Sequence, residues 1–518
     1  MKKPTQTLPD DLDLLKKIIV EQQQKDEQNA QKIRQLESKN RILTEQLRLA
    51  ISKQFGPSTE KYNVQQQDLV FDEAESTVVQ EDEVTSDDDS IKVPAHSRKK
   101  KGRVALPKDL PRVDVIHDIS DDEKTCQHDG HALTKIGEEV SEQLEIIPAK
   151  IQVLRHVRYK YACKHCEQGV TTAKLPKQPI PKSIASPALL ASVAVSKYQD
   201  ALPLYRQTNI LKRHGIELPR ATLANWMLKC GELVTPLINL MQEQVRAGPL
   251  QHIDETTVQV LNEPGKTAQS KSYMWTQVGG TTAAPVRLFS YAASRSGKVA
   301  TELLDGYQGL VMTDGYEGYS PVCMQDNITQ LACWAHVRRK FVEAQQANPK
   351  KTGKADVAIR SIQKLYAIEK RISHLTPDEK VIERQQHSLP VLNKLGTWLD
   401  KSLQQVPPKT ALGKALHYLN NQWHKLIRYI DHGYAVIDNN PAENAIRPFV
   451  VGRKNWLFAN SVGGAKASAN LYSIIETAKA NQVEPFDYLK HIFTELPKAE
   501  SLDTIERLLP WNVALQKA

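Results

Sequence analysis

Apolar residues near the start of the chain recur at alternating spacings of three and four, the heptad pattern of a helix that packs against another helix. Polar residues at Gln22, Asp26, Asn29 and Asn40 interrupt this seam. We predict a leucine-patterned helix within residues 1–62, either a solvated helix or a self-associating coiled coil. The seam positions are Leu12, Leu15, Ile19, Ile33, Leu36, Leu43 and Leu47.

Between residues 250 and 314 apolar and polar residues alternate, and a period of two is typical of β-strands. This pattern predicts a strand order of three consecutive strands, a helix and a fourth strand, which is the order of the ribonuclease-H-like fold. The fold class that we expect is α/β and multidomain, with a ribonuclease-H-like core. The predicted strands cover 250–261, 272–279, 285–293 and 309–314, and the helix covers 297–305.

Within residues 179–248, Gly215 and Pro219 separate two helical stretches, and this is the layout of a helix-turn-helix. A plain three-helix packing unit fits the pattern equally well, and Trp226 lies in the core under both interpretations. The first interpretation predicts that three polar side chains of the second helix contact a DNA groove: Arg220, Thr222 and Asn225.

Composition narrows the class of protein. The 518 residues are enough for roughly three or four domains, and 40% apolar residues exclude a wholly disordered chain. The net charge of +9 favours a polyanionic partner, although modestly for this length. No run of about 18 apolar residues and no apolar signal region occurs, so we expect a cytoplasmic, nucleoid-associated protein without a membrane partner.

Residues 63–108 form a linker in this interpretation, because the segment 64–92 is acidic and poor in aromatic residues. A basic cluster, RKKKGR, follows at 98–103. It either contacts phosphates or is a solvated run of charge.

The six cysteines of so long a chain favour metal ligands and free thiols in a reducing compartment over disulfides. Cys163 and Cys166 have the two-residue gap with which both thiolates reach one tetrahedral zinc ion. An upstream half-site is degenerate, because an aspartate stands where a second cysteine is expected. The choice is between a zinc-finger-like module over 109–178 and two unliganded thiols; the upstream candidates are Cys126, His128, Asp129 and His131.

Two carboxylates fall on apolar faces of predicted strands. Asp254 shares a strand face with Val258 and Val260, whereas Glu255 points to the opposite face. Asp314 ends a short apolar strand before a glycine, where the alternative is a turn residue. A buried carboxylate needs a cation or hydrogen-bond donors. Two such acids at strand ends therefore predict a shared metal site, and Mg²⁺ suits it because that ion binds one or two carboxylates while keeping water or phosphate.

A third acid, Glu443, lies in the segment IDNNPAENAIRPFVVGRKNW. The competing interpretation makes Asn440 the N-cap of a helix, Pro441 its first residue and Glu443 a capping residue. Asp438 is the alternative ligand. Basic residues follow Glu443 immediately, which capping does not explain.

Basic side chains flank these acids, where phosphates of DNA would pass. Trp334 is expected in the core rather than stacked on a base. Cys333 and His336 have zinc-like spacing, but with no second pair nearby in the sequence we assign no metal to them. The predicted DNA contacts are His336, Arg338, Arg339, Lys340, Arg447, Arg453 and Lys454.

Sixty residues separate Asp254 from Asp314, whereas 129 separate Asp314 from Glu443. The second interval is longer than one strand and one helix need, so we predict a helical insertion over 345–432. The helices are expected at 355–373, 377–403 and 411–430. The insertion clamps DNA, covers the site or acts as a spacer; the pattern does not choose.

Several long motifs in order carry a family resemblance. They are HIDET, TDGYEGY, CWAHVRRKF and DNNPAENAIRPFVVGRKNWLFANSVGGAKASANLYSIIETAK. Through them the chain resembles the DDE transposases of the insertion sequence 66 family over nearly its whole length. The resemblance extends to the leucine-patterned N-terminus, the FGPSTEKY segment, the zinc-type module and the C-terminal VEPFDYL.

The resemblance implies that Asp254, Asp314 and Glu443 bind two divalent ions, Mg²⁺ or Mn²⁺, and catalyse cleavage at element ends and strand transfer into target DNA. It also implies a homo-oligomeric synaptic complex, with terminal inverted repeats and target DNA as partners, and small accessory proteins from the same element. The alternative is a sequence-specific DNA-binding repressor with an inert core. The predicted domains are 1–62, 63–108, 109–178, 179–248, 249–344, 345–432, 433–495 with Glu443, and a tail at 496–518.

Overall fold

The computed structural model describes residues 12–55, 114, 151–162, 170–324, 327–347 and 353–515. The chain divides into two compact units, residues 73–159 and the remainder. In the smaller unit, Asp114 and residues 151–159 are described, without helix or strand before β1. The basic cluster at 98–103 lies outside the described residues, as do all six predicted zinc ligands: Cys126, His128, Asp129, His131, Cys163 and Cys166.

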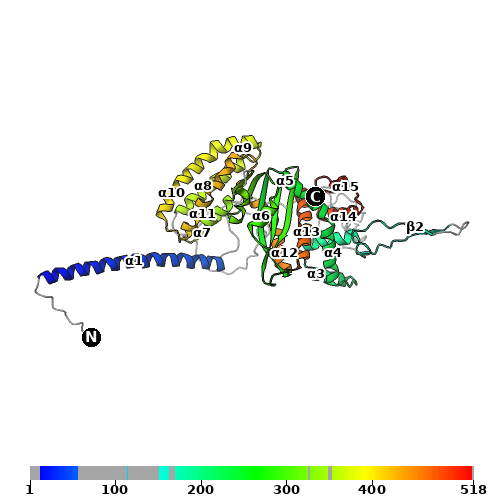
Figure 1. Cartoon of the computed structure of the whole chain (residues 1–518), viewed down its shortest axis with the longest axis horizontal. Helices are drawn as coiled ribbons and strands as arrows, with labels where there is room; N and C mark the ends of the chain where they lie inside the picture. Colours follow the sequence, from blue (N-terminus) through cyan, green and yellow to red (C-terminus); the bar gives the residue numbers. More distant parts are fainter. Residues whose placement is uncertain are drawn as a thin grey trace, which may run out of the picture. The chain divides into compact units, whose positions relative to one another are not determined.

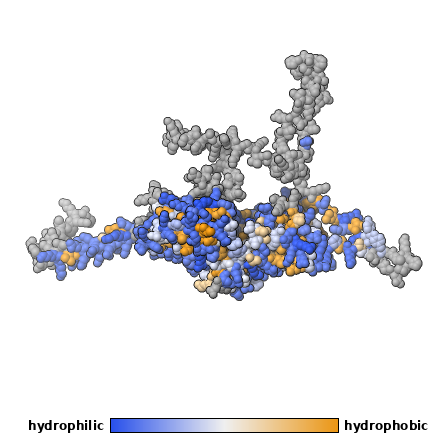
Figure 2. Space-filling model, turned by 90° about the horizontal axis from the view of Figure 1, so that it is seen from above, coloured by the Kyte–Doolittle hydropathy of each residue, from blue (hydrophilic) through white to orange (hydrophobic). Residues whose placement is uncertain are grey.

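The N-terminal helix α1 (Leu12–Phe55) is continuous, as its heptad pattern predicts (Figure 1). Apolar side chains on it lie in solvent; Leu36 and Leu47 are 55% and 61% exposed. Figure 2 shows a mostly polar surface on this helix with apolar positions between. The seam residues whose side chains are described, Ile33, Leu36, Leu43 and Leu47, are therefore solvent-exposed.

The centre of the structure is a mixed α/β unit built on a sheet of order β5-β4-β3-β6-β7, with β8 (Ala459–Ser461) paired to the far end of β3. The first three strands are antiparallel neighbours, while β6 and β7 run parallel to β3. The predicted strands and their order are confirmed. Their bounds are β3 (Leu250–Asn262), β4 (Lys271–Thr281), β5 (Ala284–Ala292), α6 (Gly297–Leu303), β6 (Gly309–Thr313) and β7 (Ile328–Ala332).

One large hydrophobic core packs the sheet against helices that precede it in the sequence and helices that follow it. Val258 and Phe289 of the sheet share this core with Trp226, Phe449 and Tyr472. Trp226 is thus a core residue, as predicted. The helices are α2 (Pro187–Tyr198), α3 (Leu204–Arg213), α4 (Arg220–Leu233), α5 (Thr235–Ala247), α12 (Asn440–Trp456), α13 (Val462–Ala480) and α14 (Pro485–Glu495). In Figure 1 α12 and α13 lie against the sheet.

Two smaller cores complete the packing. Ile253, Trp275 and Val311 pack with α6, whereas Met312 and Leu331 pack with the helices that follow β7. At the ends of the larger unit, β1 (Lys160–Ala162) pairs antiparallel with β2 (Val170–Thr172), and α15 (Leu502–Glu506) follows α14. No helix among the described residues is long and apolar enough to cross a membrane.

The interval before Glu443 is helical, its helices form one bundle (Figure 1), and α11 contacts β7. They are α7 (Trp334–Gln346), α8 (Lys354–Arg371), α9 (Pro377–Glu383), α10 (Leu389–Gln405) and α11 (Ala411–Ile427). A π-helical turn at Arg384–Ser388 joins α9 to α10. Pro390 follows that turn and has no amide hydrogen to donate, so the predicted helix 377–403 changes its hydrogen-bonding pattern there.

Arg384 ties these helices to the segment that leads into α12. Its guanidinium, 2% exposed, makes two hydrogen bonds to the Glu369 carboxylate, at 2.9 and 2.6 Å. It also donates to the carbonyl oxygens of Tyr429, His432 and Ala435. The π-helical turn therefore fixes the course of the chain a few residues before Glu443.

We expect Arg384→Met to lower the free energy of unfolding by about 3 to 5 kcal/mol, because the substitution leaves a buried carboxylate without its partner. Denaturant unfolding followed by tryptophan fluorescence measures the change. Arg371→Met is the matched control: its pair with Glu383 is exposed (55% for Arg371), so it should cost about 0 to 1 kcal/mol. Equal losses for both variants would contradict the structural role of Arg384.

Candidate active site

The first two acids lie side by side at one end of the sheet. β3 and β6 are parallel neighbours, with His252 paired to Met312. Two residues further along each strand come Asp254 and Asp314, and parallel neighbours lie about 5 Å apart. Asp314 follows directly after the last residue of β6. The backbone register alone therefore places the two acids at the same end of the sheet.

Helix α12 brings the third acid to this end of the sheet. The Glu443 carboxylate, 28% exposed, has Oε2 at 3.4 Å from Arg339 Nη2 and Oε1 at 3.7 Å from His336 Nδ1. The three acids interact electrostatically. Burial, the neighbouring Glu255 and the charges of Asp314 and Glu443 raise the pKa of Asp254 to about 7. The fold thus brings all three predicted acids into one electrostatic cluster.

The start of α12 corrects one expectation. Asn439, not Asn440, is the N-cap residue, and its side chain does not cap the helix. The alternative role of Glu443 as a capping residue is wrong, because its carboxylate faces His336 and Arg339. Asp438, the alternative ligand, accepts hydrogen bonds from the Asn440 amide at 3.1 Å and the Tyr366 hydroxyl at 2.9 Å.

Asn439 joins the three segments that carry the site. Its side chain is fully buried; Nδ2 donates to the Ile253 carbonyl at 2.9 Å and Oδ1 lies 3.0 Å from His252 Nδ1. Because an amide oxygen only accepts, His252 carries its proton on Nδ1. The Asn439 amide donates to Cys333 Sγ at 3.2 Å. One residue therefore connects β3, the end of β7 and the first turn of α12.

A second network, which the sequence did not predict, surrounds Asp314. Arg295 contacts the Glu255 carboxylate and, at 3.2 Å, Asp314 Oδ2. Its guanidinium also lies 3.9 Å from the centre of the Tyr316 ring, and Tyr319 donates a hydrogen bond to Glu255. Asp314 Oδ1 accepts the Tyr316 amide as a turn residue does, so Asp314 combines the turn role with an ion pair. Arg295 is remote in sequence from every motif, and its role depends on the folded sheet.

The helices of the interval 345–432 contact the turn after Asp314 and the segment that leads into α12. Tyr418 of α11 approaches Gly315 so closely that a Cβ there would lie 2.7 Å from its hydroxyl. Tyr366 of α8 donates to Asp438. These helices therefore support the turn after Asp314 and the entry to α12.

The predicted basic residues fall into exposed and structural sets. Arg453 donates to the hydroxyls of Thr256 and Thr257 on β3, so it joins α12 to the sheet. Lys340 is exposed and lies over the Tyr418 ring, and Arg339 reaches Glu443. Arg338 is half-buried, whereas Arg447 and Lys454 are exposed.

On α4, Arg220 and Asn225 are exposed and Thr222 is half-buried. The residues from His214 to Pro219 connect α3 to α4, so two helices with a short turn are present as predicted. Their contact with DNA stays a prediction. Trp334 is fully buried and donates to the Leu426 carbonyl, in agreement with its expected place in the core.

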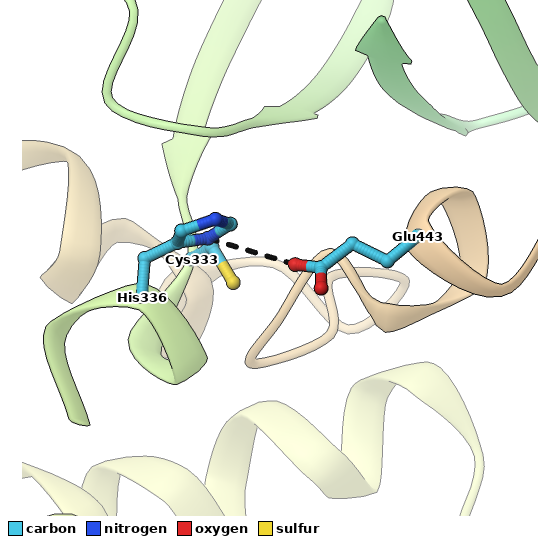
Figure 3. Close-up of side chains that lie close together, drawn as sticks. All are labelled: Cys333, His336 and Glu443. Carbon is cyan, nitrogen blue, oxygen red and sulfur yellow. Dashed lines mark ion pairs between the residues drawn. The ribbon is translucent and has the colours of Figure 1, made fainter. Parts of the chain in front are cut away.

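Cys333 and His336, which have no second pair nearby in sequence, meet Glu443 in space (Figure 3). The three possible ligand atoms lie within 4.8 Å of one another. The sequence shows the spacing of the first two residues. The third ligand comes from a helix more than 100 residues away and becomes visible in the fold.

Comparison with known families identifies the protein class. The family model described as Transposase IS66 family matches residues 182–467. Further matches are the zinc-finger binding domain of transposase IS66 at 123–167, the IS66 C-terminal element at 473–511, and a domain described as Transposase C of IS166 homeodomain at 42–115. The chain belongs to the Transposase IS66 family. The zinc-finger match contains all six predicted zinc ligands.

Two relatives from Sinorhizobium fredii (strain NBRC 101917 / NGR234) are similar over most of the chain. The chain is 32% identical to "Uncharacterized protein y4jD" over 79% of its own length and 81% of that protein. It is 30% identical to "Uncharacterized protein y4qI" over 98% of both chains. No solved structure matches significantly. Family membership implies a role in transposition, with DNA as partner, a divalent metal and zinc as expected cofactors.

Removing the Asn439 side chain should destabilise the protein and disturb the site together. We expect Asn439→Ala to cost about 2 to 4 kcal/mol, because His252 and the Ile253 carbonyl each lose a buried hydrogen bond. Denaturant unfolding measures the cost. Asn420→Ala, at an exposed position of α11, should stay within about 0.5 kcal/mol of wild type; a comparable loss there would contradict the special role of Asn439.

The raised pKa of Asp254 has a defined effect on stability. Since the pKa is about 7 in the folded protein and about 3.9 when unfolded, folding is favoured at low pH and loses that stabilisation between these values. Without divalent metal, Asp254→Asn should match wild type near pH 4 and exceed it above pH 7, by up to about 4 kcal/mol.

Thermal unfolding in EDTA across this pH range tests the effect. Asp400→Asn, an exposed change on α10, should follow wild type throughout. A difference in stability between Asp254→Asn and wild type that stays constant at all pH values would show that the surroundings do not raise the pKa of Asp254.

Proposed function

We propose that this protein is a DNA transposase that cleaves the ends of its element and joins them to target DNA, with Asp254, Asp314 and Glu443 as its catalytic metal ligands. The observation that carries the proposal is that the three acids lie near enough for the charges of Asp314 and Glu443 to raise the pKa of Asp254. Asp254 and Asp314 come together through the β3–β6 register, and Glu443 arrives from α12 with one buried carboxylate oxygen, Oε1, that lacks a hydrogen-bond partner among the described residues.

The strand arrangement supports a ribonuclease-H-like core. Three antiparallel strands in chain order, β3, β4 and β5, are followed by β6 and β7, which are parallel to β3 and lie on its other side. The first acid lies on the central strand, the second at the end of the adjacent strand and the third on a helix against the sheet. We propose this core for residues 249–344 and 433–495, with a helical insertion between them.

The residues fit a hard divalent cation such as Mg²⁺ or Mn²⁺. Carboxylate oxygens are its preferred ligands, and Asp254 has no ion pair among the described residues to offset its burial and like-charged neighbours. When bound, two such ions activate an attacking oxygen and stabilise the leaving oxygen of a phosphodiester. Asp254, Asp314 and Glu443 would hold these ions.

Charged residues around the acids have separate tasks in this proposal. Arg295 neutralises Asp314 and Glu255 on one side of the cluster. Arg339, 53% exposed beside Glu443, and Lys340 face solvent and would contact the phosphate backbone of DNA. His336 lies at the other carboxylate oxygen of Glu443, with Nδ1 at 3.7 Å from Oε1. The backbone contacts hold the strand so that its scissile phosphate reaches the acids.

The N-terminal parts would supply recognition and assembly. The zinc-finger match and the turn between α3 and α4 support the proposal of DNA-binding modules before the core. The exposed apolar seam of α1 fits a second copy of the chain in a synaptic oligomer. Element-encoded accessory proteins are further candidate partners.

Cleavage of labelled element-end DNA in Mg²⁺ tests the proposal. Asp254→Asn, Asp314→Asn and Glu443→Gln should each reduce 3′-end cleavage and strand transfer by at least about 100-fold, as for loss of groups that act in the transition state. Binding of the same DNA should change by less than tenfold, because other surfaces carry the phosphate contacts. The control, Asp400→Asn, should retain full activity.

The result that would overturn the metal triad is cleavage that survives Asp254→Asn. Wild-type protein that binds element ends but never cleaves them, even with any accessory proteins supplied, would instead support a DNA-binding repressor with an inert core.

A further inference from the structure

We propose that Cys333, His336 and Glu443 form a binding site for Zn²⁺ that shares Glu443 with the catalytic cluster. The site lies where the end of β7, the first turn of α7 and the second turn of α12 meet (Figure 3). Its three donor types are a thiol, an imidazole and a carboxylate. The consequence for catalysis rests on the proposed function, whereas the binding does not.

The geometry is close to that of a three-ligand metal centre. Cys333 Sγ, a ring nitrogen of His336 and a carboxylate oxygen of Glu443 lie within 4.8 Å of one another. Zinc bonds of about 2.0 to 2.3 Å hold tetrahedral ligands roughly 3.5 Å apart. Small rotations of the His336 and Glu443 side chains bring the atoms to that separation, since all three already face one point (Figure 3).

The polar atoms at this point lack other partners. His336 Nδ1 and Glu443 Oε1 are buried, are 3.7 Å apart and have no hydrogen-bond partner among the described residues. A buried polar atom left in this state is costly. A cation between them would satisfy both, and the salt-bridge partner Arg339 holds the second oxygen, Oε2, on the other side of the carboxylate.

The surroundings also fit a bound thiolate. Cys333 Sγ accepts the Asn439 amide at 3.2 Å, and such a bond strengthens when the sulfur carries charge. Binding forms a metal–sulfur bond and releases the thiol proton to solvent, so the step needs no oxidant or reductant. The donor set selects the ion: thiolate and imidazole suit zinc, whereas Mg²⁺ prefers oxygen ligands.

The shared carboxylate links this site to the proposed chemistry. With Zn²⁺ between Cys333 and His336, Glu443 Oε1 is turned toward α7 and is withdrawn from the ions held by Asp254 and Asp314. Zn²⁺ and the catalytic ions therefore compete for one side chain. The expected effect is inhibition of cleavage by Zn²⁺ at concentrations far below those of Mg²⁺.

Cobalt binding tests the site directly, because Co²⁺ replaces zinc and gives a charge-transfer absorption when a thiolate ligates it. The zinc-finger module is silenced first, in the full chain, by Cys126→Ser, Cys163→Ser and Cys166→Ser. This protein should bind one further equivalent of Co²⁺ with a thiolate band. Adding Cys333→Ser should abolish the band, and His336→Gln or Glu443→Gln should weaken affinity by roughly 100-fold, since even partners outside the ligand shell are worth about 10- to 100-fold.

Two matched controls separate this site from its neighbours. Cys323→Ser removes a half-buried thiol outside the cluster, and Asp314→Asn removes a catalytic acid; both should retain the band. If Cys333→Ser does not fold by circular dichroism, His336→Gln and Glu443→Gln decide. A thiolate band that survives Cys333→Ser, its absence before that change, or equal loss with Asp314→Asn would overturn the proposal.

Activity provides a separate readout. Zn²⁺ should inhibit Mg²⁺-dependent cleavage by the protein with its zinc-finger module intact and zinc-loaded. His336→Gln, with each rate expressed relative to the same variant without added Zn²⁺, should shift the inhibiting concentration upward by roughly 100-fold, in line with its loss of affinity. An unchanged inhibiting concentration would overturn the competition for Glu443. If the wild-type protein does not cleave DNA, the proposed function fails while the cobalt spectra still decide whether the metal site exists.

Discussion

The site depends on the buried hydrogen bonds of Asn439. This residue precedes α12, yet its side chain bonds to the strand that carries Asp254 and its amide bonds to Cys333 at the end of β7. His252 completes the arrangement, and burial lowers the pKa of that histidine to about 4, so the ring stays neutral and donates from Nδ1. These bonds therefore hold the first turn of α12 against β3.

The helical interval before α12 extends the same constraint. Arg384 holds three carbonyl groups of the approach to Asn439, and Tyr366 holds Asp438. Tyr418 packs on Gly315, beside Asp314. A spacer would need none of these contacts. The helices therefore serve as a scaffold that holds the second and third acid segments against the sheet, even if they also have another role toward DNA.

The sequence predicted the features that depend on local pattern. Alternation identified the strands and the apolar faces of Asp254 and Asp314, and the length of the interval before Glu443 indicated the inserted helices. It placed the N-cap at Asn440 because an Asn–Pro pair resembles a cap, whereas Asn439, held by tertiary hydrogen bonds, is the N-cap residue and the helix begins at Asn440. Arg295 and the meeting of Cys333 with Glu443 could not be predicted, because each joins residues whose separation in sequence carries no periodic signal.

The charge distribution explains why the cluster is suited to cations and is not merely acidic. Arg295 balances Glu255 and Asp314, and Arg339 balances one oxygen of Glu443. Asp254 accepts a hydrogen bond from the backbone amide of Glu255 at 2.9 Å and has no basic partner among the described residues. The carboxylate oxygens left without a basic partner among the described residues are thus those of Asp254 and Oε1 of Glu443. A cation bound at these oxygens would reduce the repulsion between the carboxylates. The same cation bound beside Glu255 would meet a carboxylate that Arg295 already neutralises.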